Sequence, residues 1–143
     1  MNSQQPKLFL WSLLLPVLWL TVGATFSYLF PEKRLGIWGI VLIIYFTLVP
    51  FCWYLAKRCG RYLRGVEVWK MIGYLTFWAL ICESLAIWYL VTLEPNMNLE
   101  GDVLLFTIGF TAAMDFLFMF LGVKFAGKKI FNFFLGAPQE AQA

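Results

Sequence analysis

Residues 71–93 read MIGYLTFWALICESLAIWYLVTL, and residues 103–123 read VLLFTIGFTAAMDFLFMFLGV. Each stretch contains a single charged residue, which is Glu83 in the first and Asp115 in the second. A helix of about 20 apolar residues crosses the hydrocarbon core of a bilayer, because each residue advances it by about 1.5 Å. Both stretches therefore predict membrane-spanning helices, and each of these helices carries a carboxyl group near its middle.

Two further stretches, residues 8–30 and 35–56, are apolar and have no charged residue at all. Over the 143 residues of the chain, 62% are hydrophobic and 13% are charged, which is about half the charged fraction of a soluble domain. The runs lack the period-2 alternation of barrel strands. We therefore expect an all-α membrane protein, built as an antiparallel four-helix transmembrane bundle in a single integral domain over residues 1–143.

The lysine and arginine residues orient this predicted bundle. Two of the eleven, Lys33 and Arg34, lie between the first two spans, and the other nine lie in the N-terminal tail, between the second and third spans, or after the fourth. Cytoplasmic loops carry the excess of basic residues in membrane proteins. The N-terminus and the C-terminus are therefore both predicted to be cytoplasmic.

Basic residues beside the predicted spans are expected to contact lipid headgroups. These residues are Lys57, Arg58, Arg61, Arg64, Lys128 and Lys129. Residues 124–135 mix lysines with bulky apolar side chains, which is typical of a short interfacial segment along the inner headgroups. The net charge of +3 is small, and we interpret it as a topology signal and not as a nucleic-acid footprint.

Glu83 and Asp115 are the candidate binding or proton site. An acidic residue at the centre of a bilayer costs about 2.5 to 3.5 kcal/mol on insertion scales, so two of them indicate a functional site or an interior polar contact. Neighbouring antiparallel helices would bring both carboxyls to one depth. The alternative is that two protonated acids act as hydrogen-bonded contacts that fix the helix register. The predicted hydrogen-bond partners are Trp19, Tyr45, Thr76 and Thr111.

Helical periodicity places both acids on faces with small or hydroxylated side chains, such as Ala79 beside Glu83 and Ala112 beside Asp115. Packed membrane-helix interfaces favour such residues, so these faces are expected to point into the bundle or toward a partner. Bulky residues lie on the opposite faces and are expected to meet lipid. They are Tyr74, Trp78, Ile81, Leu85, Trp88, Phe106, Phe110, Leu117 and Phe120.

The sequence lacks the signatures of the common enzyme classes. It has no histidine, no nucleophile elbow, no phosphate-binding loop, and three cysteines without paired metal-ligand spacing. The connectors between the spans are too short to hold a catalytic or nucleic-acid-binding domain. We therefore expect no enzymatic activity, no cofactor, no metal site and no nucleic-acid partner.

The layout resembles functionally uncharacterised families of small four-span bacterial inner-membrane proteins. The matching features are a short N-terminal tail, a basic middle loop ending in Glu67-Val68-Trp69-Lys70, and Gly122-Val123-Lys124-Phe125 at the end of the last span. The resemblance implies a multi-pass protein of the bacterial inner (cytoplasmic) membrane. In size and span count the chain is also similar to the small multidrug-resistance exporters, whose essential glutamate lies in the first helix, where this chain has no acid.

Two functions are consistent with these features. In the first, the chain is an interaction protein, an accessory subunit or a toxin-immunity protein, whose interior acids and small-residue helix faces bind another membrane protein or a toxin. In the second, it is a homodimer or larger homo-oligomer that transports a cation or hydrophobic amine with proton coupling through Glu83 and Asp115. The lipid bilayer is a partner in both.

Overall fold

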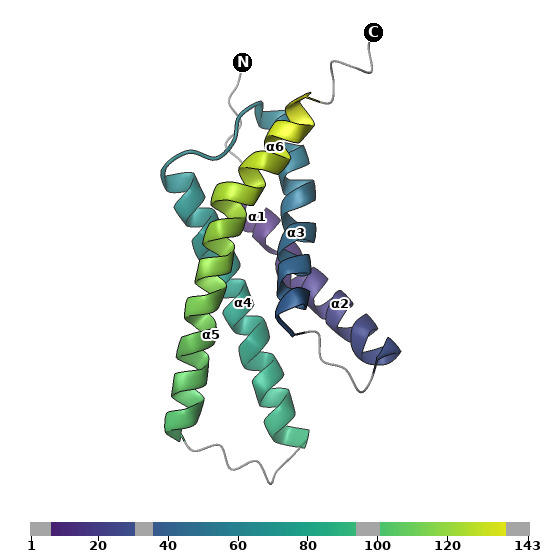
Figure 1. Ribbon diagram of the computed structural model, residues 1–143, viewed down its shortest axis with the longest axis vertical. Coiled ribbons are helices and arrows are strands. Elements are labelled where there is room, and N and C mark those ends of the chain that lie inside the picture. The colour runs from purple at the N-terminus through teal and green to yellow at the C-terminus, as the bar shows by residue number, and fades with distance from the viewer. Residues whose placement is uncertain (1–6, 31–35, 94–100, 137–143) are drawn as a thin grey trace.

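The computed structural model describes residues 7–30, 36–93 and 101–136, and every element in these ranges is a helix (Figure 1). The elements are α1 (Leu8–Ser12), α2 (Leu14–Leu29), α3 (Gly36–Tyr54), η1 (Leu55–Cys59), α4 (Val66–Leu93), α5 (Gly101–Leu121), η2 (Gly122–Ala126) and α6 (Gly127–Gly136). The two segments η1 and η2 are π-helical turns, each continuous with the α-helix before it.

Four helical segments of the described chain are long and apolar enough to cross a membrane. They are Leu8–Leu29, Gly39–Cys59, Val66–Tyr89 and Gly101–Gly136. The prediction of an all-helical, multi-pass membrane protein with four spans is therefore confirmed at this level. The third span, α4, begins at Val66, ahead of residue 71, because the left-handed turn at Gly65 (φ +46°) directly precedes it.

The helices pack in pairs around one apolar core. α4 lies along α5, α3 contacts α2 and α6, and α1 contacts α4 (Figure 1). The fully buried side chains of the core come from all four spans. They include Leu15, Leu48, Phe51, Met71, Ile72, Leu75, Met119 and Val123. Most of these positions belong to the same half of the bundle, the half that contains η1, η2 and the loop between α3 and α4.

Pro16 explains why the first span is divided into α1 and α2 at Leu13. A proline has no N–H for the carbonyl four residues before it, and its ring crowds that carbonyl. The hydroxyl of buried Ser12 donates to the Phe9 carbonyl at 2.7 Å, and the Val17 N–H reaches the Leu13 carbonyl only at 3.5 Å. The break allows α1 to pack on α4 while α2 packs on both α3 and α4 (Figure 1).

The π turn η2 leaves a backbone carbonyl that another segment satisfies. In η2, the Gly127 N–H donates to the Gly122 carbonyl, five residues back, and so does not take the Val123 carbonyl that an α-helix would give it. The Tyr62 hydroxyl donates to this Val123 carbonyl. The Cys52 thiol donates to the Gly127 carbonyl at 3.3 Å. The turn therefore joins the C-terminal helix to α3 and to the loop.

Glycine is required where these segments meet. A Cβ atom at Gly127 would overlap the Tyr62 hydroxyl, and one at Gly122 would lie 3.0 Å from Ile44 Cγ2. Burial raises the pKa of Tyr62, so its hydroxyl stays protonated and remains a donor. The Tyr62 ring also packs on Phe131 of α6, with ring centroids 5.5 Å apart.

Gly127→Ala is therefore expected to destabilise the protein. The added methyl group displaces the Tyr62 hydroxyl from the Val123 carbonyl, which costs about 1 to 3 kcal/mol for the lost hydrogen bond and the steric shift. Thermal unfolding in detergent, followed by circular dichroism, measures the effect as a lower midpoint temperature.

Gly73→Ala is the matched control, because Gly73 is an exposed helical glycine whose added Cβ meets nothing within 4 Å. It is expected to leave the midpoint unchanged or to raise it. In a Tyr62→Phe background, Gly127→Ala should cost less, since the overlapping oxygen is gone. An equal loss in both backgrounds would show that Tyr62 is not the reason for the glycine.

Candidate functional site

The two intramembrane acids meet between α4 and α5. Asp115 is buried, with 2% of its surface exposed, and Glu83 is half-buried. Their side chains interact directly, and Glu83 also interacts with the side chain of Thr111. The structure thus brings together the two residues that the sequence placed at one depth.

A small cavity lies beside the two carboxyls at the junction of all four spans. Its volume is about 20 Å³. A cavity of about 10–15 Å³ is large enough for one water molecule, so this one has room for a single water. The lining side chains are Leu15, Trp19, Ile40, Ile43, Ile44, Ala79, Glu83, Asp115 and Met119. The cavity is therefore apolar except at Trp19 and the acid pair.

The acid pair retains hydrogen-bonding capacity that the described residues do not use. Glu83 Oε2 and Asp115 Oδ2 are buried and have no hydrogen-bond partner among the described side chains and backbone. An unsatisfied buried polar atom costs about 1–3 kcal/mol. Because both residues line the water-sized cavity, these carboxyls can bind one water molecule or a donor group on a partner.

The four predicted hydrogen-bond partners differ in their positions. Thr111 contacts Glu83, and Trp19 lines the cavity, although none of the hydrogen bonds among the described residues joins Trp19 to a carboxyl. Tyr45 is 52% exposed and lies on another face of α3, away from the cavity. Thr76 is two turns from Glu83, outside the cavity lining, and its buried hydroxyl has no partner. The expectation for Tyr45 and Thr76 is corrected accordingly.

The predicted bulky faces are exposed in the half of the bundle away from η1 and η2. There Leu85, Trp88 and Phe106 are 55%, 66% and 75% exposed. Nearer the loop the expectation is wrong for Tyr74 and Trp78, whose rings contact Phe9 with centroids 5.6 and 6.2 Å apart. The physical reason is that α1, separated from α2 by the Pro16 break, covers this side of α4.

No described lysine or arginine lines the cavity, so within the described chain the acids interact with each other and not with a cation. No group of three or more cysteine, aspartate or glutamate side chains in the described ranges is placed to hold a metal ion. The chemistry of the site is therefore that of a carboxyl pair: it can accept hydrogen bonds, share a proton and bind a donor.

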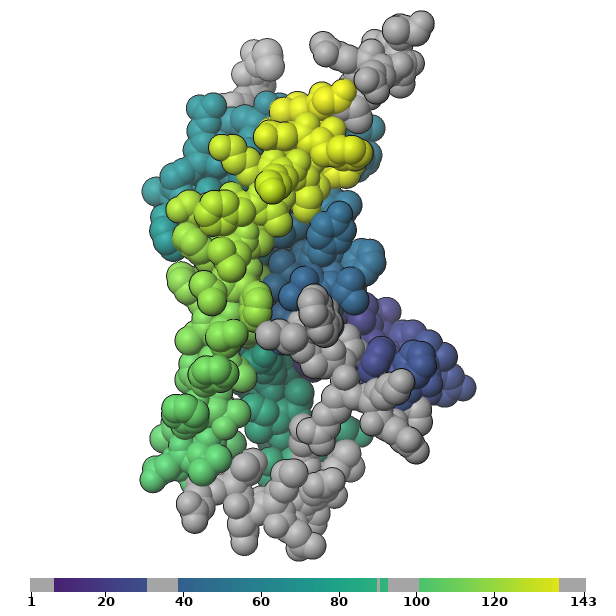
Figure 2. Space-filling view, in the orientation of Figure 1, coloured from purple at the N-terminus to yellow at the C-terminus, as the bar shows by residue number. Residues whose placement is uncertain are grey.

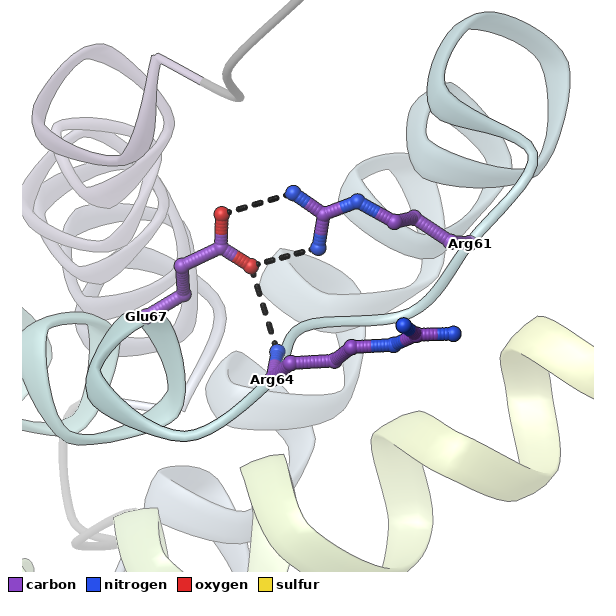
Figure 3. Close-up of polar contacts among 3 residues, drawn as sticks. All are labelled: Arg61, Arg64 and Glu67. Atoms are coloured by element: carbon purple, nitrogen blue, oxygen red, sulfur yellow. Dashed lines mark hydrogen bonds and ion pairs between the residues drawn. The ribbon is translucent and has the colours of Figure 1, made fainter. Parts of the chain in front are cut away.

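A second polar cluster lies in the loop between η1 and α4. Arg61 forms a bidentate ion pair with Glu67, at 2.7 and 2.9 Å, and the Arg64 N–H donates to the same carboxylate at 3.2 Å (Figure 3). The hydrogen bonds that Arg61 donates to the Glu67 carboxylate raise the pKa of Arg61 above its usual value. Glu67 thus holds the loop against the first turn of α4 through one side chain and one backbone group.

The other basic residues proposed to contact headgroups are exposed. They are Lys57, Arg58, Arg64, Lys128 and Lys129. The Lys57 ammonium lies 4.6 Å from the centroid of the Trp53 ring, a distance typical of a cation–π contact. All of these residues lie at the end of the molecule that holds the loop, η1 and α6, as the sequence predicts for one membrane surface.

Comparison of the chain with family models, with curated proteins and with solved structures finds no match in any of the three. The resemblance to small four-span bacterial families therefore stays a prediction. The function has to be argued from the acid pair, the helix faces and the basic loop.

Glu83 and Asp115 are expected to couple in a double-mutant cycle. Glu83→Leu and Asp115→Leu each leave one carboxyl without its partner, so together they should cost less than the sum of the two. Measured hydrogen-bond couplings between membrane helices average about 0.6 kcal/mol and reach about 1.7 kcal/mol. Unfolding by a denaturing detergent in mixed micelles gives the free energies of unfolding of the parent protein, the two single variants and the double variant.

The control cycle pairs Glu83→Leu with Asp102→Leu, because Asp102 is exposed at the first turn of α5. Changes at these two separated sites should add within about 0.3 to 0.5 kcal/mol. If the changes in unfolding free energy for the Glu83 and Asp115 substitutions are also additive, the two carboxyls do not stabilise each other.

Proposed function

We propose that this chain is a polytopic protein of the bacterial inner membrane that acts by binding another membrane protein, as an accessory subunit or as an immunity protein against a membrane-directed toxin. In this proposal the four spans are antiparallel and both termini are cytoplasmic. The positive-inside distribution supports this orientation, since eight of the eleven basic residues lie between Lys57 and Lys70 or between Lys124 and Lys129.

The observation that carries the proposal is the small size of the space beside the acid pair. The carboxyls face a cavity with room for one water, which is lined mainly by aliphatic side chains. A substrate site in a transporter is a larger space with access from a membrane surface. A pair with spare acceptor oxygens beside so small a space is better suited to binding a donor or to holding helices together than to passing a solute.

A partner helix has a suitable surface on α5. Gly109 and Ala113 are exposed, one turn apart, and a Cβ at Gly109 would meet nothing within 4 Å. The described chain itself therefore does not require a small residue at Gly109. Small residues at this spacing let two membrane helices approach closely, which is the main source of their association in lipid.

The alternative is a homo-oligomeric, proton-coupled transporter of a cation or hydrophobic amine. The half-buried position of Glu83 favours it, because a carboxyl that is not fully enclosed can be reached from the edge of the bundle when a second copy completes a pathway. In that case Glu83 and Asp115 would release a proton to bind the cation.

The orientation gives a direct prediction. A reporter enzyme that is active only in the periplasm, fused after residue 143, is expected to be inactive. The same reporter inserted in the loop between α4 and α5 should be active. The opposite pattern would reverse the topology and place the basic loop on the outer surface.

Partner binding is tested by a photoreactive amino acid placed at Ala113 in cells. We expect an adduct with one discrete membrane protein, and we expect Gly109→Leu to abolish it, because the larger side chain prevents close helix approach. Leu85 is the control position, since it is 55% exposed on a bulky face of α4. Lipid adducts alone from both positions would contradict the proposal.

The same variants separate the two functions. Purified protein in proteoliposomes with a pH gradient is expected to show no gradient-driven uptake of ethidium, a hydrophobic cation. Uptake that is lost in Glu83→Gln, together with an adduct of twice the chain mass from Ala113, would establish the transporter in place of the interaction protein.

A further inference from the structure

A second pocket, distant from the acid pair, lies where the loop after η1 meets the C-terminal helix. Its volume is about 660 Å³. Three segments form it: the loop, the first turn of α4, and the η2–α6 junction. The lining residues are Gly60, Arg61, Tyr62, Leu63, Arg64, Val68, Lys124, Phe125, Lys128 and Phe131. We call it the basic pocket, because four of its side chains are cationic.

Three of these four cations have no acidic partner among the described residues. Arg61 is neutralised by Glu67 in the ion pair described above. Arg64 gives Glu67 only its backbone N–H, and its guanidinium points away from that carboxylate, on the side of the yellow-green C-terminal helix (Figure 3). Lys124 and Lys128 are exposed on that helix. No described aspartate or glutamate lines the pocket.

The position of the three free cations depends on the fold and not on sequence proximity. Arg64 is about 60 residues from Lys124 and Lys128 in the chain. The Tyr62 hydroxyl on the Val123 carbonyl and the Tyr62 ring on Phe131 hold the loop against η2 and α6. In the space-filling view the yellow α6 lies directly against the teal loop segment (Figure 2). The pocket is therefore a built feature of the tertiary structure.

The rest of the lining is apolar. Leu63 is buried, and Phe125 and Phe131 contribute aromatic surface beside the two lysines. Lys124 lines the pocket, and its ammonium lies 4.8 Å from the centroid of the Phe120 ring, one turn earlier in the chain. A phosphate next to an apolar body is the chemistry of a phospholipid at the level of its headgroup and glycerol.

We propose that the basic pocket binds the phosphate group of an anionic phospholipid, with the Arg64 guanidinium as a bidentate donor and the Lys124 and Lys128 ammonium groups as further donors. Arginine presents a planar pair of N–H groups that matches phosphate oxygens. Basic pockets between spans on the cytoplasmic side are a recognised setting for such lipids. This inference does not depend on the partner-binding function.

The alternative explanation is diffuse electrostatic attraction between the basic surface and any anionic membrane. The structure provides a matched comparison, because Lys57, Arg58 and Lys129 are exposed basic residues near the same end of the molecule but do not line the basic pocket. Diffuse attraction depends on total charge, so removing either set of three should have the same effect.

The experiment measures the binding of dioleoylphosphatidylglycerol to the purified full chain in nonionic detergent micelles, where no continuous anionic surface exists. The pocket variant is Arg64→Gln/Lys124→Gln/Lys128→Gln, and the control variant is Lys57→Gln/Arg58→Gln/Lys129→Gln. We expect the pocket variant to lose affinity on the order of a hundredfold, since each cation near an anionic lipid is worth about fivefold. The control variant should lose less than about threefold.

Equal losses in the two variants, or no loss in either, would overturn the proposal. Two probes identify the ligand: dioleoylphosphatidylcholine should bind weakly because its phosphate is neutralised within the headgroup, and inorganic pyrophosphate should not displace phosphatidylglycerol at millimolar concentration. Displacement by pyrophosphate would assign the pocket to a soluble phosphate and overturn the lipid.

Folding of the variants is checked by the same thermal unfolding measurement. Arg64→Gln alone provides a second test, because its backbone N–H, which Glu67 binds, is retained and only the free guanidinium is lost. About a fivefold loss of phosphatidylglycerol affinity with an unchanged unfolding temperature supports the proposal. An unchanged affinity in this folded variant would overturn the role of Arg64.

Discussion

The absence of water from the hydrocarbon core governs this structure, because every backbone N–H and C=O inside the bilayer needs a partner within the protein. Continuous helices meet this requirement over most of each span. Where the series of backbone hydrogen bonds in a helix is interrupted, side chains provide hydrogen bonds to backbone carbonyls. The Ser12 hydroxyl bonds to a carbonyl near the Pro16 break, and Tyr62 and Cys52 bond to carbonyls at the second π turn. The bonds of Tyr62 and Cys52 also join the C-terminal helix to the loop and to α3.

The same constraint applies to the two acids. In a medium of low dielectric constant, two carboxyls without a cation gain most by facing each other, and Glu83 and Asp115 do so beside a space for one water. The basic residues avoid the constraint by gathering beyond the spans. The molecule therefore has two polar regions, an acidic one among the helices and a basic one at the end where the loop and α6 meet.

The sequence was sufficient to predict the four spans and the proximity of Glu83 to Asp115, because charge-free windows and residue depth depend only on local composition. It was not sufficient for Tyr45, since its span is apolar on all sides and periodicity cannot say which side faces the bundle. The cover that Phe9 provides for Tyr74 and Trp78 depends on the Pro16 break. The contact of Tyr62 with Val123 joins residues that are far apart in the chain. The only local sign of it in the sequence is Gly127, a glycine within a helical segment.

The π turn at Gly122–Ala126 accommodates one more residue than an α-helix of the same length. Each residue turns a helix by about 100°, so the turn changes the rotational phase of everything that follows it. In this phase Phe131 and Lys128 face the loop between α3 and α4. In a helix one residue shorter they would be directed elsewhere. A single insertion or deletion in evolution would thus be enough to create or remove the basic pocket without altering any of its charged side chains.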